Sequence, residues 1–241
     1  MKRLLTLFAL SGTLALSSCE TLQQAAGAAM GGSGSGITEA EAADGIKEAL
    51  GQGLGKAVFQ LNSVDGFFKD AMYKILLPPD AKKIENTLRS LGFNNMVDKA
   101  ILQINRGAED AAGYAKPIFI DAVKTMTLQD AIGLVRGGDT SATHFFRVKT
   151  TDKLVAAFTP VIQSSLDKVE ATKYYGDIVN KYNSLPTTFK KVNPDLTNYV
   201  TNKATDALFN LIAKEEANIR NNFAARSTDL LKKVFGTFLG K

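Results

Sequence analysis

The chain has 241 residues, with 29 lysines and arginines against 24 aspartates and glutamates, and its formal net charge is +5 at pH 7. Its single cysteine has no partner for an intramolecular disulfide, and one cysteine with one histidine is too few for a zinc site built from the usual nitrogen and sulfur ligands. We therefore expect no metal and no other cofactor, and a fold that depends on its apolar core alone.

Residues 1–18 have the layout of a secretory signal peptide. The positive pair Lys2-Arg3 precedes an apolar run over 4–16, and small residues follow. The sequence Leu16-Ser17-Ser18-Cys19 resembles the lipobox of bacterial lipoproteins, in which the cysteine is acylated and becomes the mature N-terminus. The alternative is an ordinary secretory signal with an incidental cysteine, but a lone exported thiol is a liability in an oxidising compartment. We predict that Cys19 is lipidated.

Lipidation would determine where the protein resides. The apolar run is shorter than the about 20 residues that a spanning helix needs, whereas several acyl chains on one residue give stable anchoring. In Gram-negative lipoproteins an aspartate after the cysteine favours the inner membrane, and this chain has Glu20 there. We therefore predict a lipid anchor in the outer membrane, at its periplasmic face.

Export also bears on the partners that the protein can meet. Loss of Lys2 and Arg3 with the signal peptide lowers the 29 basic residues to 27, against 24 acidic ones, so the mature chain is close to neutral. We expect no nucleic-acid partner. The predicted partners are the membrane, through the acyl chains, and a protein of the cell envelope.

Residues 19–37 are predicted to form a flexible tether behind the lipidated cysteine. Alanine, glycine, serine and glutamine dominate this stretch, which ends in an alternation of glycine and serine over 31–36. Such a composition buries too little apolar surface to become ordered. Residues 38–241 remain, a length suited to one helical domain.

The first helix of this domain is predicted to begin after Thr38 and to run to about Leu61, because Thr38 and Glu41 form a capping-box pattern. Glycines weaken this helix and indicate close contact with a neighbouring helix; they are Gly45, Gly51, Gly53 and Gly55. The stretch Gly51–Lys56 lacks the spacing and the preceding strand of a phosphate-binding loop.

The apolar run Ile75-Leu76-Leu77-Pro78-Pro79 follows, and its prolines stop any helix. It has two interpretations, a plug buried under a turn or an exposed docking strip. Asp80 is then expected to cap a helix that runs to Leu91 and ends at Gly92.

The longest regular pattern begins at Asn94. Apolar residues recur there at intervals of three or four, as on one face of a helix: Val97, Ile101, Ile104, Ala108, Ala111, Ala115, Ile118, Ala122 and Met126. Pro117 is expected to bend this helix or to split it in two. Beside the apolar face, Arg106 can reach Glu109 or Asp110 across one turn.

Two helices are predicted in the middle of the chain. Thr127 and Asp130 form a second capping box, which opens a short helix ending at Gly137-Gly138. Asp139 or Thr140 is then expected to cap a long helix that reaches about Val169 and contains Pro160.

Three helices are predicted in the last third of the chain. One spans Tyr174–Leu185, and a second begins at Asn193-Pro194-Asp195, with Asn193 as its predicted cap, and continues to around Arg220. Ser227 is expected to cap the third. Its apolar side is either packed on the core or facing the membrane, and it carries Leu230, Leu231, Val234, Phe235, Phe238 and Leu239.

No segment shows sustained two-residue alternation rich in β-branched residues. The sequence therefore predicts an all-α fold, a single multi-helix bundle domain of about eight to ten helices behind the signal peptide and the flexible tether.

Few catalytic combinations are possible in this sequence. With Cys19 committed to lipid no cysteine–histidine pair remains, and a serine–histidine–acid triad would need His144 without any nucleophile-elbow sequence. We expect His144 on the surface near a helix start. The adjacent Glu215 and Glu216 could act as acid and base, or Glu216 could pair with Arg220 one turn on.

Several motifs occur together in this chain: Lys74-Ile75-Leu76-Leu77-Pro78, Asn105-Arg106-Gly107-Ala108-Glu109, Met126-Thr127 with Asp130-Ala131, Gly137-Gly138-Asp139-Thr140 with Ala142-Thr143 and Phe146-Arg147, Asp195-Leu196 with Tyr199-Val200-Thr201, Glu215-Glu216 to Ile219-Arg220, and Leu230-Leu231-Lys232-Lys233-Val234-Phe235. Through them the chain resembles the bacterial lipoprotein family of domain of unknown function 4197. The resemblance covers nearly all of the mature domain. It implies a single helical domain behind a lipobox, with no established activity. The chain departs from the family at Gly107, where alanine is more frequent, and at His144, where an acidic or polar residue is expected.

The polar residues inside these motifs are our candidates for one internal network: Asn105, Arg106, Glu109, Thr143, Arg147, Glu216 and Arg220. They either satisfy one another as buried groups or line a ligand pocket. Three functional hypotheses follow. The first is a non-enzymatic binding or scaffolding lipoprotein, and the second is a carrier of an apolar ligand or lipid in a helical cavity. The third is a carboxylate-dependent envelope hydrolase, for which Glu109 and Glu216 are candidate acidic side chains.

Overall fold

The structure, a computed structural model, describes residues 38–168, 170–184, 186 and 190–239. The predicted signal peptide and tether, with Cys19, lie outside the described residues. The helices have these bounds: α2 Glu39–Asn62, α3 Lys82–Ser90, α4 Asn94–Ala112, α5 Ala115–Lys124, α6 Leu128–Arg136, α7 Ser141–Asp167, α8 Ala171–Asn183, α9 Leu196–Asn221 and α10 Asp229–Leu239, with 3₁₀ turns at Pro79–Ala81 and Phe223–Ala225. No strand occurs among the residues described.

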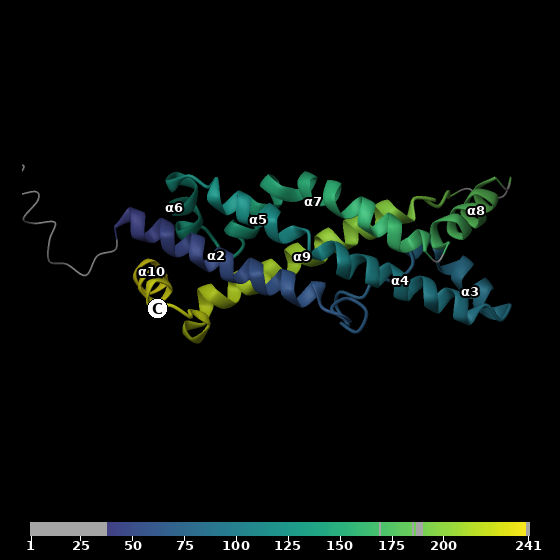
Figure 1. The fold of residues 1–241 in the computed structure, drawn as a ribbon, viewed down its shortest axis with the longest axis horizontal. Coiled ribbons are helices and arrows are strands. Elements are labelled where there is room, and N and C mark those ends of the chain that lie inside the picture. The colour runs from purple at the N-terminus through teal and green to yellow at the C-terminus, as the bar shows by residue number, and fades with distance from the viewer. Residues whose placement is uncertain (1–37, 169, 185, 187–189, 240–241) are drawn as a thin grey trace, which may run out of the picture. The chain divides into compact units, whose positions relative to one another are not determined.

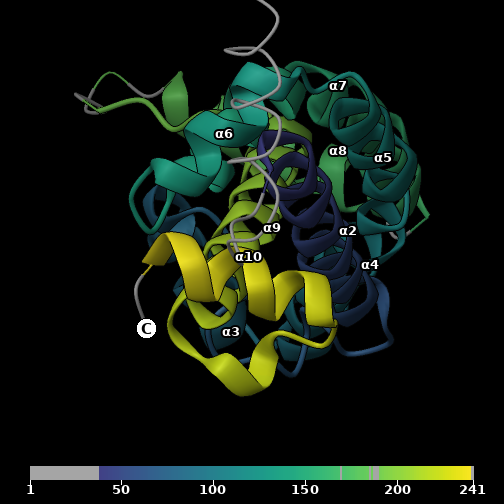
Figure 2. The same ribbon diagram turned by 90° about the vertical axis from the view of Figure 1, so that its left-hand side faces the viewer.

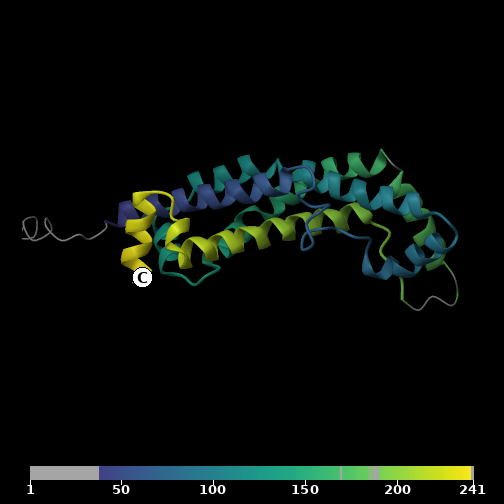
Figure 3. The ribbon, with the colours of Figure 1, turned by 90° about the horizontal axis from the view of Figure 1, so that it is seen from below.

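The long helices pack along one another within the compact unit Ile37–Lys241. Figure 1 shows α9 running beside α2 and α7, while α4 and α5 follow one another and both pack on α2 and α7. The segment α3 and the helix α8 lie together at one end of the bundle, as Figure 3 also shows. The predicted all-α bundle is confirmed, and α2 to α10 fall within the predicted range of eight to ten helices.

Fully buried aromatic side chains fill the space between the long helices. The Phe119 ring meets Phe146 and Phe209 edge to face, with ring centroids 5.8 and 6.2 Å apart. These three residues come from α5, α7 and α9, so the contact joins three helices that are distant in sequence. Among the described helices, none is both long and apolar enough to cross a membrane.

Both capping boxes that the sequence predicts are present. The Thr38 side chain accepts from the Glu41 N–H and the Glu41 carboxylate accepts from the Thr38 N–H. Thr127 and Asp130 make the same reciprocal pair before α6. The helix predicted from Asn94 divides at Gly113-Tyr114, and Pro117 lies in the first turn of α5, where a missing N–H removes no helical bond. The predicted split is confirmed.

Four predicted caps are wrong, those of α3, α7, α9 and α10. Asp80 lies in a 3₁₀ turn and α3 starts after Ala81 without a side-chain cap. Asp195, not Asn193, caps α9, because its carboxylate accepts from the Asn198 N–H. At α10 the hydroxyl of Thr228 accepts from the Leu231 N–H, whereas Ser227 donates to Gln52 of α2.

The last helix packs on the core. Leu231, Val234 and Phe235 are buried, and α10 crosses the beginning of α2 beside α6 (Figure 2). This confirms core packing for these residues; the side chains of Phe238 and Leu239 lie outside the described part. Lys233 of α10 also forms an ion pair with Glu41 of α2 at 3.1 Å.

Two glycines of α2 should respond in opposite ways to alanine. A Cβ on Gly45 would lie 2.5 Å from Cγ2 of Val234, a stiff side chain of α10, whereas a Cβ on Gly55 would meet nothing within 4 Å. Gly55→Ala should raise the free energy of unfolding by about 0.5–1 kcal/mol through helix propensity. Gly45→Ala should lower it by about 1–3 kcal/mol through overpacking. Urea unfolding followed by circular dichroism checks both; an equal effect of the two variants would contradict the close approach of α10.

Candidate functional site

The seven polar candidates do not form a single network. The structure distributes them over separate sets of contacts, around Glu216 and Arg220 of α9, around Glu109 and Asn105 of α4, and around Arg147 of α7. The first two sets are buried, and the third opens to solvent.

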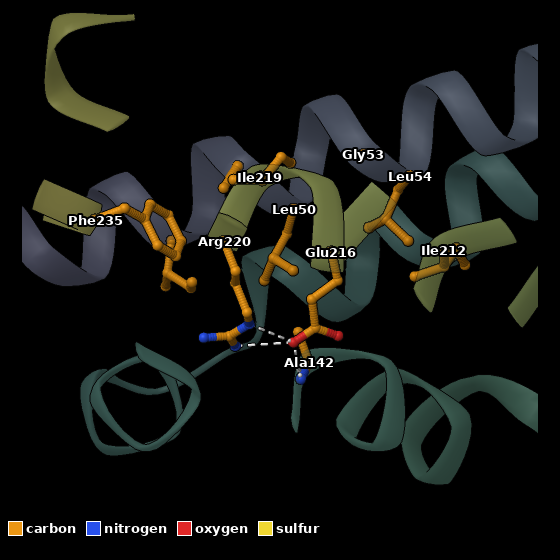
Figure 4. Close-up of a pocket in the computed structure, with 11 residues that line it drawn as sticks. Leu50, Gly53, Leu54, Ala142, Ile212, Glu216, Ile219, Arg220 and Phe235 are labelled. Atoms are coloured by element: carbon orange, nitrogen blue, oxygen red, sulfur yellow. Dashed lines mark hydrogen bonds and ion pairs between the residues drawn. The ribbon is translucent and has the colours of Figure 1, made fainter. Parts of the chain in front are cut away.

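Glu216 takes the place of the predicted cap of α7. Thr140 makes no side-chain cap there; instead, the Glu216 carboxylate accepts from the backbone N–H groups of Ala142 and Thr143 at 3.0 and 2.8 Å. The Thr143 hydroxyl donates to the same carboxylate at 2.8 Å. A carboxylate also suits the positive end of a helix dipole. Figure 4 shows Glu216 pointing from α9 toward Ala142.

Arg220 completes this set, one turn after Glu216. Its guanidinium donates to the Glu216 carboxylate through Nε and Nη2 at 3.0 and 2.8 Å, which confirms the predicted i,i+4 pair. Nη2 also donates to the Leu134 carbonyl and the Ser141 hydroxyl, both at 2.8 Å. Because Leu134 is in the last part of α6, this arginine joins α9 to the turn between α6 and α7.

The hollow beside this ion pair is too small for a ligand. It is lined by apolar residues of α2, α9 and α10, including Leu50, Ile212 and Phe235 (Figure 4), and its volume is about 20 Å³. A cavity of that size holds at most about one water molecule. The Glu216–Arg220 pair therefore stabilises the fold and does not line a ligand site.

Glu109 holds the turn after α2. Its Oε1 accepts from the N–H groups of Phe67 and Phe68, both at 3.1 Å, and its other oxygen pairs with Arg106 of the preceding turn. Arg106 also pairs with Asp65 at 2.8 Å. The Glu109 and then the Asp65 carboxylates raise the pKa of Arg106, so the guanidinium remains charged.

Asn105 holds the same segment farther along. Its Oδ1 accepts from the Ile75 N–H at 2.8 Å, and its Nδ2 donates to the Ile75 carbonyl at 2.8 Å and the Ile101 carbonyl at 2.7 Å. The Asn105 side-chain amide thus satisfies both the N–H and the carbonyl of Ile75, as the backbone of a neighbouring strand does in a β-sheet. Together Asn105 and Glu109 fasten residues 63–78 onto α4.

The apolar run in residues 75–79 is partly buried and partly exposed. Ile75 is 4 % exposed whereas Leu76 is 52 % exposed, so the buried-plug interpretation holds for Ile75 and the exposed-strip interpretation for Leu76. Leu77 lines two hollows. Its position therefore shapes both.

The first hollow is a polar groove of about 640 Å³ between this segment and α9. Arg147 lies here, paired with Asp206 at 3.0 Å, and its guanidinium lies over the Phe209 ring at 4.6 Å from the centroid. The other cations lining it are Lys74, Lys82 and Lys203, and its second carboxylate is Glu85. The buried Tyr73 hydroxyl has no hydrogen-bond partner among the described residues.

The second hollow is an apolar pocket of about 430 Å³ at the end of the bundle formed by α3, α4 and α8. We call it the α3–α8 pocket. Its apolar lining consists of Leu77, Ala81, Ile84, Leu88, Met96, Val97, Ala100, Ala171, Tyr175 and Leu196. Lys99, Lys168 and Glu170 complete the lining. Ligand sites in proteins span about 300–1,000 Å³, so the pocket is large enough for a small ligand.

The hydrolase hypothesis fails for the carboxylates proposed for it. Glu109 and Glu216 are 3 % and 8 % exposed. Each carboxylate is paired with an arginine and accepts hydrogen bonds from two backbone N–H groups. Glu215 pairs with Lys56 at 3.5 Å. No group of three histidine, cysteine, aspartate or glutamate side chains that could hold a metal occurs within the described part of the chain. His144 is exposed in the first turn of α7, as predicted.

Sequence reasoning missed several buried or half-buried charges, among them Asp65 and Arg226. Asp65 adopts a left-handed backbone conformation with φ of 70° and pairs with Arg106. Arg226, only 2 % exposed, donates to the Ile219 and Arg220 carbonyls at the end of α9. A basic residue just after a helix C-terminus is a recognisable signal for Arg226. No local signal connects Asp65 to Arg106.

Comparison with known proteins gives one finding. A family model described as "Protein of unknown function (DUF4197)" matches residues 36–236. No curated protein and no solved structure gives a significant match. The matched range includes both buried sets, the polar groove and the α3–α8 pocket.

Proposed function

Since this chain belongs to the DUF4197 family, as its motifs predict, we propose for it a role in binding: a lipoprotein anchored at the periplasmic face of the outer membrane, whose helical domain contacts a partner or scaffolds an assembly of the cell envelope. The observation that carries the anchor is the sequence Leu16-Ser17-Ser18-Cys19 behind a charged and apolar leader. Several acyl chains on one residue would make the attachment stable.

The structure supports binding over hydrolysis by Glu109 and Glu216, because their carboxylates are committed to buried pairs. The polar groove offers a surface for a partner. It combines the exposed Leu76 with cations on two elements, Lys74 of the segment and Lys203 of α9. An exposed apolar side chain rimmed by charges is typical of contact surfaces.

Palmitate labelling of the full chain in a Gram-negative host tests the anchor. The wild type should incorporate the label, and Cys19→Ser should lose it completely because the chain has no other thiol. Ser18→Ala keeps a small residue before the cysteine and should remain labelled. An unlabelled wild type recovered in the aqueous fraction would refute the anchor.

Separation of the two membranes extends the same experiment to localisation. The wild-type protein should sediment with the outer membrane, and Glu20→Asp should shift it to the inner membrane. Glu20→Gln, which removes the charge without introducing aspartate, serves as the control and should stay with the wild type. Co-sedimentation of the wild type and both variants with the inner membrane would contradict the predicted location.

The α3–α8 pocket favours a second function, a carrier of an apolar ligand. Its lining is mostly apolar and its volume of about 430 Å³ is within the range of known ligand sites. A carrier tethered at a membrane has lipid within reach. Native mass spectrometry of protein extracted from its own membranes would show only the empty chain if this role were wrong.

A further inference from the structure

The α3–α8 pocket leaves apolar surface uncovered inside a concave site. Leu77, Ile84, Leu88, Met96 and Ala100 all line it and are only partly buried, and three of them, Leu77, Ile84 and Ala100, pack against the core. Below them lie Val97 and Leu196, which are 3 % and 2 % exposed. A methylene group that covers such a surface raises affinity about fourfold, so a chain of methylenes binds strongly here.

The chemistry of the lining restricts the body of the ligand. The only hydroxyl among the lining residues is that of Tyr175, and it already donates to the Asn193 carbonyl at 3.2 Å. Burial, together with the charge of Asp80, raises the pKa of Tyr175 to about 12, so the hydroxyl is neutral. With no free polar group to pair, the buried part of a ligand must itself lack polar groups.

The rim restricts the end of the ligand. Lys99 of α4 and Lys168, just after α7, both line the pocket and are exposed, and neither has a carboxylate partner among the described residues. One carboxylate, Glu170, shares the rim, which leaves an excess of one positive charge. Two unpaired ammonium groups beside an aliphatic hollow complement an anion attached to a hydrocarbon chain.

We propose that the α3–α8 pocket binds one long acyl chain that ends in an anionic group, with the chain among Leu77, Ile84 and Leu88 and the anion between Lys99 and Lys168. This inference rests on the carrier role proposed above and names its ligand class. A fatty acid and a single-chain phospholipid share this chemistry.

The test uses the mature chain, residues 19–241, with Cys19→Ser. It contains the whole compact unit Ile37–Lys241 and carries no acyl chain of its own. Palmitate and lysophosphatidylglycerol are titrated separately by isothermal calorimetry, with hexadecanol as the uncharged chain. We expect saturable binding of one molecule per chain for at least one anionic ligand, and affinity about tenfold weaker for hexadecanol.

Three variants locate the site. Ala100→Phe places a ring in the pocket and should weaken binding at least about tenfold, because the chain loses its space. The double variant Lys99→Ala/Lys168→Ala should weaken the anionic ligands about tenfold and leave hexadecanol unchanged. Lys173→Ala removes an exposed lysine of α8 outside the pocket lining and should bind as the parent. Thermal melts confirm that each variant is folded.

The outcomes are decisive in each arm. Absence of saturable binding of both anionic ligands, or wild-type affinity in a folded Ala100→Phe, overturns the pocket. Equal affinities for palmitate and hexadecanol, or an unaffected double lysine variant, overturn the anionic end. The mass of the ligand retained by protein from its own membranes distinguishes a fatty acid from a phospholipid. Failure of palmitate labelling at Cys19 would refute the anchor alone, since the titrated chain lacks that group.

Discussion

Glu216→Gln should lower the free energy of unfolding by about 3–5 kcal/mol, the cost of breaking a buried ion pair by removing one partner. The carboxylate accepts five hydrogen bonds, two from the α7 backbone, one from the Thr143 hydroxyl and two from Arg220. A glutamine amide turns one oxygen into a donor, so it faces N–H groups that then have no acceptor. Arg220, 3 % exposed, stays buried as an unpaired cation.

Urea unfolding followed by circular dichroism measures this loss, and the adjacent carboxylate supplies the control. Glu215 pairs with Lys56 at 3.5 Å. The side chains are 21 % and 57 % exposed, and Oε2 of Glu215 makes no hydrogen bond that a glutamine would lose, so Glu215→Gln should cost less than about 1 kcal/mol. Since a domain is stable by only about 5–15 kcal/mol, the two variants should differ clearly in their midpoints. Equal midpoints for Glu215→Gln and Glu216→Gln would show that Glu216 does not cap α7.

The same geometry predicts an asymmetry within the pair. Arg220→Met removes the cation but leaves Glu216 at the positive end of α7, where Ala142 and Thr143 still donate to it. It should therefore cost less than Glu216→Gln, which breaks the pair and leaves only one acceptor oxygen for the donors at the start of α7.

Local signals in the sequence predict the helices well. Thr38 with Glu41 and Thr127 with Asp130 each lie three residues apart, and both capping boxes form as the pattern indicates. The division near Pro117 and the Glu216–Arg220 pair are equally local. In each case the residues that decide the structure are within one turn of each other.

The site could not be predicted in the same way, because its decisive contacts are distant in sequence. The cap of α7 comes from Glu216, 74 residues after Ala142, so the nearby Asp139 and Thr140 are misleading. Asn105 reaches Ile75 and Arg106 reaches Asp65 through a turn whose path the sequence does not show. The α3–α8 pocket likewise combines residues from Leu77 to Leu196 and has no motif.

Gly66 illustrates why that turn must be traced in the structure. A Cβ at this position would lie 2.2 Å from the Gln60 carbonyl oxygen, so the chain folds back tightly on the end of α2. The Phe67 and Phe68 N–H groups then point to Glu109. A glycine in the sequence indicates a turn. The path of the chain after the turn depends on the hydrogen bonds to Glu109, which is distant in sequence.

Glu109→Gln should lower the free energy of unfolding by about 2–3 kcal/mol, less than Glu216→Gln because the amide oxygen can still accept from Phe67 and Phe68. Its NH₂ group would face Arg106, which keeps Asp65 as a partner and is 31 % exposed in its side chain. The neighbouring Asp110 is exposed, and Asp110→Asn should change stability by less than about 0.5 kcal/mol.

The loss at Glu109 should also be local, because this carboxylate fastens residues 63–78 to α4. Hydrogen exchange of the Phe67 and Phe68 amides should accelerate in Glu109→Gln by more than that of the α7 amides, whereas Glu216→Gln should accelerate the α7 amides. Since Leu77 lines the α3–α8 pocket, a loosened segment should also weaken binding of an acyl ligand there. Uniform acceleration at all amides would mean that the turn and the bundle unfold as one unit, and the assignment of Glu109 as a local fastener would be wrong.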